Sequence, residues 1–317
     1  MTAKLAFGET ITVSGETEFD PHRSIWTDLR NVAFTQDWID VKGIRTRYLR
    51  AGDPDAPKLI MLHGTGGHSE VFAPNLGPFS EHYDCWAIDF VGHGYTDKPD
   101  VPYDSFFTAA YLRDFMDSAG IEHADLIGIS VGALHCLRLA DMEPSRIGRM
   151  VLVTPFGAPM PEEGDITYEF WIGNEQPPAD GRDEAAKNPT FEIARKILSG
   201  VVADIDKIPD DMVSARFDSA RQPGAAEAYK HVMWWMDTDL RLKNTYRVEK
   251  LAGIEHETLA FVGAGDPAFS PYASRMAAAM PKCAGVVIEG ASHWANYESP
   301  QVFNELALTF LREGTTS

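Results

Sequence analysis

The sequence predicts an α/β fold in which a mostly parallel central sheet carries helices on both faces, with a helical cap inserted into it. Short apolar runs of five or six residues alternate with longer segments of helical periodicity, as strands and helices do around a parallel sheet. This alternation breaks between about residues 156 and 243 and then resumes. The break indicates an insertion between two strands, which we interpret as a cap over a pocket rather than a subdomain that only packs.

The apolar runs give the predicted strands in chain order. A first segment, 38–48, alternates apolar and polar residues, as a half-buried strand does. The later runs are almost continuously apolar, as expected for strands that are buried on both faces. They span residues 58–63, 85–89, 124–129, 150–154, 258–262 and 285–289.

Helical periodicity fills most of the intervals between these strands. It predicts core helices at 106–119, 131–142, 271–280 and 301–312, and cap helices at 210–217 and 225–237. The predicted organisation is a first core segment, a cap and a second core segment. Their boundaries are 1–155 (with an irregular N-terminal arm over about 1–35), 156–243 and 244–317.

Length and composition exclude several classes of protein. The chain has 317 residues, which fits one large α/β domain or two smaller ones. Apolar residues make up 44% and charged residues 24%, as in an ordinary soluble globular protein. The 28 basic and 47 acidic side chains give a formal charge of -19, which repels nucleic acid and anionic membranes. A small anionic substrate is still compatible, because a pocket can carry its own positive charge.

The sequence gives no support for a cofactor, a metal or a disulfide. The three cysteines, Cys85, Cys136 and Cys283, form no CxxC pair, and no HExxH, phosphate-loop or dinucleotide-binding spacing occurs. The first residues lack the apolar run of a secretory signal, and no run approaches the ~18 apolar residues of a membrane span. We therefore expect a cytoplasmic protein without membrane or nucleic-acid partners, and both a monomer and a homo-oligomer stay open.

The strongest chemical signal is the segment Gly128-Ile129-Ser130-Val131-Gly132, which lies between a predicted strand and a predicted helix. A G-x-S-x-G sequence at such a turn is typical of a nucleophile elbow, where small flanking residues allow the tight turn. The positive end of the following helix points at the same place. The alternative is a glycine-rich turn without chemistry. The context favours Ser130 as a nucleophile.

A serine nucleophile needs a base, and the base needs a group that orients it. Asp266 follows the strand at 258–262, and His293 follows the strand at 285–289. Both lie at the carboxyl ends of strands, where open α/β sheets place their ligands. We therefore interpret His293 as the base and Asp266 as the acid. Glu257 and Glu289 are the alternative acids.

The oxygen that becomes negative during attack by Ser130 needs hydrogen-bond donors that are already in place. One is the backbone N–H of Val131, the residue after the nucleophile. The other is expected from the glycine-rich loop after the strand at 58–63, with the N–H of Thr65 as the donor. This loop alone fits a flexible turn equally well, but together with the elbow it predicts an oxyanion hole.

Together these motifs resemble the α/β-hydrolase family from about residue 38 to residue 312. His63-Gly64, the Asp89–Asp97 segment, the serine elbow and the late Asp and His follow the family's order. Within the family, the chain resembles the meta-cleavage product hydrolases, which cleave a C–C bond in vinylogous 1,5-diketones formed during bacterial degradation of aromatic rings. The features that carry this resemblance are a segment of the loop after the first parallel strand, a His-Trp pair and a cap segment: Asn75–Phe79, His293-Trp294, Ala215–Phe217 and Gln222–Gly224.

The resemblance implies roles for further residues. Arg216 matches the cap arginine that binds the carboxylate end of the substrate, and a guanidinium fork suits a carboxylate. Trp294 is placed beside it, and Gly64 and Trp234 are placed at the same substrate pocket. The alternative is a solvated cap arginine and a tryptophan that only packs in the core.

Three functions are therefore weighed. The resemblance favours a serine hydrolase that cleaves the C–C bond of a 2-hydroxy-6-oxo-dienoate. A carboxylesterase or lactonase would use the same residues on a C–O bond. A ligand receptor built on a hydrolase fold would not use them at all. Dehalogenase and epoxide hydrolase chemistry need a carboxylate nucleophile, which Ser130 disfavours.

Overall fold

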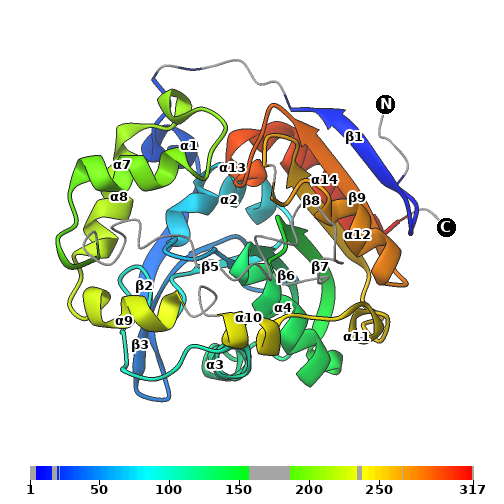
Figure 1. Ribbon diagram of the computed structural model, residues 1–317, viewed down its shortest axis with the longest axis horizontal. Helices are drawn as coiled ribbons and strands as arrows, with labels where there is room; N and C mark the ends of the chain where they lie inside the picture. Colours follow the sequence, from blue (N-terminus) through cyan, green and yellow to red (C-terminus); the bar gives the residue numbers. More distant parts are fainter. Residues whose placement is uncertain are drawn as a thin grey trace.

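The described part of the chain forms one twisted sheet with helices on both sides (Figure 1). The computed structural model describes residues 5–15, 20, 22–156, 186–233, 238–266 and 268–315. Within these residues the strand order is β1-β9-β8-β7-β6-β4-β5-β3-β2. Only β2 and β3 pair antiparallel with their neighbours. The strands are β1 (Thr10–Ser14), β2 (Phe34–Val41), β3 (Ile44–Ala51), β4 (Lys58–Leu62), β5 (Asp84–Ile88), β6 (Ala124–Ile129), β7 (Ile147–Val153), β8 (Thr258–Gly263) and β9 (Cys283–Glu289).

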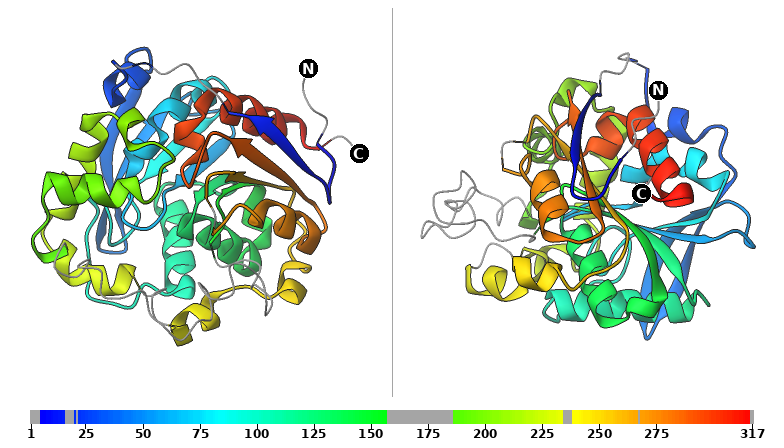
Figure 2. Two further views of the ribbon diagram at one scale, coloured as in Figure 1. Left: turned by 45° about the horizontal axis from the view of Figure 1, so that its top comes forward. Right: turned by 90° about the vertical axis from the view of Figure 1, so that its right-hand side faces the viewer.

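Helices cover the sheet on both faces, so the predicted fold class is confirmed (Figure 2). Core helices α3, α4 and α12 pack on one face, and α2, α13 and α14 pack on the other. The α-helices are α1 (Ile25–Leu29), α2 (Ala73–Ser80), α3 (Ser105–Ser118), α4 (Val131–Met142), α7 (Phe191–Ser199), α8 (Asp210–Ala220), α9 (Ala225–Val232), α10 (Thr238–Asn244), α11 (Val248–Leu251), α12 (Tyr272–Ala279), α13 (Ala295–Glu298) and α14 (Pro300–Glu313). Short 3-10 turns are η1 (Ser69–Phe72), η2 (Pro144–Arg146) and η3 (Ile205–Lys207).

The continuous apolar runs become strands that are buried on both faces. In β4, Leu59 and Met61 join the core that contains α2 and α14, whereas Ile60 and Leu62 join the core that contains α3 and α4. All four side chains are 0% exposed. Because successive strand residues point to opposite faces, one short run contributes to two hydrophobic cores.

The first predicted strand is wrong in one respect, because residues 38–48 belong to a hairpin of two strands. β2 and β3 pair antiparallel from Phe34 opposite Ala51 to Val41 opposite Ile44. The turn residues Lys42 and Gly43 have φ values of 51° and 88°. Two consecutive positive φ values are typical of the tight turn whose twist matches a hairpin. The alternation of apolar and polar residues runs through this turn, which hid it in the sequence.

The N-terminal arm is more regular than expected. β1 pairs in parallel with β9, with Thr10 opposite Gly285, and extends the edge of the sheet (Figure 1). Ser24 caps the N-terminus of the short helix α1, and its side chain accepts a hydrogen bond from the Thr27 N–H. The backbone N–H of Ile25 donates to Asp211 of α8 at 2.7 Å, so the arm is joined to the cap segment.

The sequence analysis places the segment Asn75–Phe79 in a loop, but this segment lies in helix α2. Pro74 lies in the first turn of α2, where a proline costs no hydrogen bond, and Pro78 lies inside the helix. A proline inside a helix removes one backbone hydrogen bond, and this is why the segment had no helical signal. Asn75 is fully buried and donates to Asn296 O at 3.0 Å and to Asn304 Oδ1 at 2.8 Å.

The inserted segment is helical where it is described. Helix α8 continues three residues beyond the predicted Phe217, to Ala220, and α9 ends at Val232. The rest of the predicted helix, 234–237, lies outside the described residues, as does Trp234. The boundaries 156 and 243 stay a prediction. No helix among the described residues is long and apolar enough to cross a membrane.

Candidate active site

Ser130 occupies a strained turn between β6 and α4. Its φ and ψ are 54° and -119°, a backbone conformation that residues other than glycine rarely adopt. A Cβ on Gly128 would lie 2.6 Å from Gly132 O, and one on Gly132 would lie 2.5 Å from Leu62 O. Both glycines are therefore required by close backbone contacts. The strained geometry of the serine is the feature expected of a nucleophile elbow.

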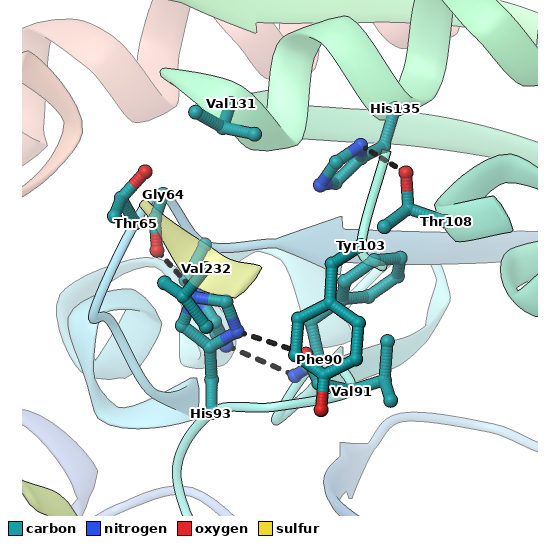
Figure 3. A pocket seen from close by; sticks show the side chains of 11 residues that line it. Gly64, Thr65, Phe90, Val91, His93, Tyr103, Thr108, Val131, His135 and Val232 are labelled. Atoms are coloured by element: carbon teal, nitrogen blue, oxygen red, sulfur yellow. Dashed lines mark hydrogen bonds between the residues drawn. The ribbon is translucent and has the colours of Figure 1, made fainter. Parts of the chain in front are cut away.

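The glycine-rich loop after β4 packs directly against this serine. A Cβ on Gly64 would lie 2.9 Å from Ser130 Cβ, so only glycine allows the approach. The backbone N–H groups of Thr65 and Val131 donate to no acceptor among the described residues. Both residues line one pocket (Figure 3). Unused donors beside a serine hydroxyl are what an oxyanion hole requires.

Asp266 and His293 lie together at the same edge of the sheet. Asp266 Oδ2 and His293 Nδ1 are 2.6 Å apart, and Asp266 is only 7% exposed. The other carboxylate oxygen accepts from the N–H groups of Ala268 at 3.1 Å and Phe269 at 3.2 Å. Because the carboxylate accepts from Nδ1, the Nε2 of His293 keeps its lone pair and can take a proton.

The backbone of His293 is held from both sides. Its carbonyl accepts from Thr154 Oγ1 at 2.9 Å, and its N–H donates to Val201 O at 3.0 Å. The hydrogen bonds of the described residues do not include one between Ser130 and His293. Such bonds are often long without substrate and shorten when it binds. The alternative acid Glu257 pairs with Arg149 at 2.7 Å, and Glu289 is exposed.

Arg216 reaches from helix α8 onto the glycine-rich loop. Its Nη2 lies 2.8 Å from the position that a Cβ on Gly66 would occupy. None of the ion pairs among the described residues involves Arg216. Burial lowers the pKa of Arg216 to about 10, so the side chain stays charged at neutral pH. A shielded cation without a carboxylate partner is suited to an anionic ligand.

Trp294 follows His293 and is mostly packing. It is 5% exposed and belongs to the core that contains α13 and α14, with its ring 6.0 Å from that of Tyr297. The structure therefore brings Arg216 to the candidate oxyanion loop and packs Trp294 in the core, and the predicted role of Trp294 in substrate binding stays a prediction.

A buried polar network below the loop was not predicted. Arg47, 3% exposed, pairs with Asp89 at 3.0 Å and with Glu70 at 2.5 Å. Asp89 also accepts from the Ser69 N–H at 2.7 Å, and His68 Nδ1 lies 2.8 Å from Glu70. Burial alone would raise the pKa of Glu70, but His68 and Arg47 outweigh it and lower that pKa. This network ties the segment after the glycine-rich loop to the end of β5.

Sequence reasoning also missed the pocket itself. It is lined by His93, Tyr103, Thr108 and His135 beside Thr65 and Val131, and Val232 comes from the cap (Figure 3). The signal in the sequence was His93, which lies in the segment Asp89–Asp97 that resembles the family pattern. His135 is a single histidine in an apolar helix and gave no signal.

Comparison with known proteins decides the family. A family model described as the alpha/beta hydrolase fold matches residues 57–300. The chain belongs to this family. The resemblance inferred from the motifs is therefore confirmed, and the protein is a hydrolase by family.

Individual relatives are distant but cover most of the chain. A carboxylesterase of Bacillus subtilis is 24% identical over 93% of this chain and 93% of its own. The 2-hydroxy-6-oxo-6-(2'-aminophenyl)hexa-2,4-dienoic acid hydrolase of Metapseudomonas resinovorans is 26% identical over 88% and 91%. The solved 2-hydroxy-6-oxo-6-phenylhexa-2,4-dienoate hydrolase of Rhodococcus is 22% identical, with a TM-score of 0.73 over 89% and 100% of the two chains. At this identity the solved structure shows the shared fold.

Proposed function

We propose that this α/β-hydrolase uses Ser130 as nucleophile, His293 as base and Asp266 as the group that orients the imidazole. The bond of 2.6 Å between Asp266 and His293, at the sheet edge where Ser130 is held in its strained turn, carries this proposal. The N–H groups of Val131 and Thr65 would bind the oxyanion.

We further propose that the substrate is a meta-ring-fission product of the 2-hydroxy-6-oxo-dienoate type. The guanidinium of Arg216 lies over the glycine-rich loop and forms no ion pair with the described residues, which supports an anionic substrate, because a guanidinium matches a carboxylate with an adjacent oxygen. Relatives named as dienoate hydrolases at 26% and 28% identity support the same choice. Arg216 would hold the carboxylate end while the 6-oxo carbon lies at Ser130.

The proposed reaction consumes one water. The dienol first becomes a ketone by moving its hydroxyl proton to C5. His293 then takes the proton of Ser130 Oγ, and Oγ bonds to C6. The C5–C6 bond breaks, its electron pair passes along the conjugated chain to the 2-oxygen, and that oxygen takes the proton from His293. Water, activated by His293, then replaces Oγ on the acyl carbon, and Ser130 regains its proton. The products are a carboxylic acid and a 2-hydroxydienoate.

A second candidate is hydrolysis of a carboxylic ester or lactone by the same residues. The carboxylesterase of Bacillus subtilis, which is similar over 93% of this chain, favours it. The core site serves both reactions equally well, and the difference lies in the anionic head of the dienoate. An ester without a carboxylate would gain nothing from Arg216.

The test compares the two substrate classes on the purified full-length protein. We expect turnover of a yellow 2-hydroxy-6-oxo-6-phenyl dienoate, read as loss of its colour, to exceed turnover of a p-nitrophenyl ester. Ser130→Ala should lower kcat at least about 10⁴-fold while the dienoate still binds, because only the nucleophile is lost. Normal turnover by this variant would refute the assigned role. Failure of a fluorophosphonate to label Ser130 would favour a receptor without catalysis.

A further inference from the structure

A small pocket adjoins the candidate oxyanion hole and is rich in histidine. Thr65 and Val131 form one side of it, and Val232 from cap helix α9 forms another (Figure 3). Its volume of about 10 Å³ is enough for one group the size of a water molecule. We call it the histidine pocket, after the three imidazoles among the residues that line it: His63, His93 and His135, with Phe90, Val91, Tyr103 and Thr108.

His93 presents a bare acceptor. Its Nδ1 lies 3.0 Å from Val91 O, and because a carbonyl only accepts, Nδ1 must carry the proton. The Nε2 atom therefore keeps its lone pair. This atom is buried and has no hydrogen-bond partner among the described residues. A buried acceptor without a donor is unfavourable, so a ligand group that donates to it stabilises the site.

His135 presents a second bare acceptor. Thr108 Oγ1 lies 3.0 Å from Asp104 O and 2.9 Å from His135 Nδ1. When the single Thr108 hydroxyl proton goes to Asp104 O, the hydroxyl accepts from His135 Nδ1, and this is the tautomer on which the inference rests. The Nε2 of His135 then also keeps its lone pair, and Figure 3 shows this nitrogen turned away from Thr108 toward the pocket. The ring is fixed by stacking on Phe90 at 4.7 Å and 15°.

The third imidazole is already satisfied. His63 Nε2 accepts from the Phe90 N–H at 3.0 Å, and His63 Nδ1 donates to Gly64 O at 2.8 Å. Burial lowers the pKa of His135 to about 3 and that of His63 to about 4, and it lowers the pKa of His93 well below its usual value. The imidazoles are therefore neutral at physiological pH, and the two free lone pairs remain acceptors.

We propose that the histidine pocket selects substrates that carry a hydroxyl or amino group close to the scissile carbonyl, which donates to His93 and His135. This inference rests on the proposed function and adds a specificity to it. A substrate with only hydrocarbon at this place would displace any water and leave both acceptors unpaired. Sites built to hydrogen-bond a substrate group discriminate strongly against analogues that lack the group. The distal ring of a 6-aryl dienoate can carry such a donor.

The experiment compares kcat/KM for the 6-phenyl dienoate with its ortho-, meta- and para-hydroxyphenyl analogues and its ortho-aminophenyl analogue. We expect at least one donor-bearing analogue to be preferred about 10-fold or more by the wild type. His135→Phe keeps a ring stacked on Phe90 but removes the acceptor, so it should bring that ratio to about one. His123→Phe, the same change at an exposed histidine lining a surface hollow with Asp55 and Lys58, should leave the ratio unchanged.

The outcomes separate this inference from the proposed function. If the wild type prefers no donor-bearing analogue, or if the preference survives His135→Phe, the pocket holds water only and the inference is wrong, while Ser130-dependent turnover of the parent dienoate still stands. If Ser130 turns over esters and not dienoates, the same ratio is measured with p-nitrophenyl benzoate and its ring-hydroxylated analogues. If neither class is turned over, both proposals fail. The preference of the wild type is measured without any variant. The inference can therefore be refuted even if His135→Phe does not fold.

Discussion

The sheet edge that holds the candidate catalytic residues and the cap helices beside it are stabilised in different ways. At the edge, Asp89 is 0% exposed and pairs with Arg47, which is 3% exposed. In the cap, Arg195 of α7 pairs with Asp206 and Asp210, whose side chains are 85% and 81% exposed. Exposed ion pairs contribute little to the free energy of unfolding and are screened by salt, whereas breaking a buried, hydrogen-bonded ion pair lowers that free energy strongly.

This difference separates two functions of the molecule. In the proposed mechanism, the edge has to hold a strained serine, a histidine and two backbone donors in fixed positions for any substrate. The cap contributes Arg216 and Val232, which we propose meet particular parts of a ligand. Changes at the edge should therefore affect every substrate, and changes in the cap should affect some substrates and spare others.

Asp266→Asn should have the largest effect. An amide at this position would direct its N–H at His293 and stabilise the wrong tautomer, so Nε2 would carry the proton and could not accept one. We expect kcat to fall about 10⁴-fold for dienoates and esters alike. Steady-state kinetics on both substrate classes measure it.

The control for Asp266→Asn is the thermal unfolding midpoint, which should change little because Asn retains an oxygen for the N–H groups of Ala268 and Phe269. Loss of activity for one substrate class only would contradict a shared site at the sheet edge.

Asp89→Asn should have the next largest effect, on stability. Asp89 accepts from Arg47 at 3.0 Å, from the Ser69 N–H at 2.7 Å and from the Tyr95 N–H at 2.9 Å. The amide of Asn has one oxygen and cannot accept at both positions. The buried Arg47 also loses one of its two carboxylate partners. We expect the free energy of unfolding to fall by about 3–5 kcal/mol, measured by urea denaturation. Asp37→Asn, at an exposed position of β2, should change it within about 0.5 kcal/mol. Equal effects of the two variants would remove the contrast between the edge and the surface.

Local sequence patterns predicted the edge better than they predicted what covers it. β6 and α4 have the bounds expected from the sequence, because a continuous apolar run and a glycine-flanked serine are both local signals. The hairpin turn at Lys42 was hidden because its alternation continues through the turn. Helix α2 was hidden because it contains Pro78.

The contacts between distant segments left no such signal. Arg216 lies on Gly66 only after α8 folds over the loop, and the two are 150 residues apart in the chain. The lone pair of His135 depends on Thr108 and Asp104 of another helix and its cap. A histidine in an apolar helix is usually core packing, so its chemistry could be assigned only from the hydrogen bonds around it.

Arg216→Gln should have the smallest effect of the three and should separate the cap from the edge. Gln keeps part of the side chain over the loop but removes the charge that we assign to the substrate carboxylate. We expect KM for the dienoate to rise about 10- to 100-fold, as for a lost charged hydrogen bond, with KM for a neutral p-nitrophenyl ester changed less than about twofold. Arg221→Gln, an exposed arginine at the end of α8 that pairs with Asp218, is the matched control and should change neither value. An equal rise in KM for both substrates would show that Arg216 supports the loop and does not select the substrate, and the esterase would then be the better assignment.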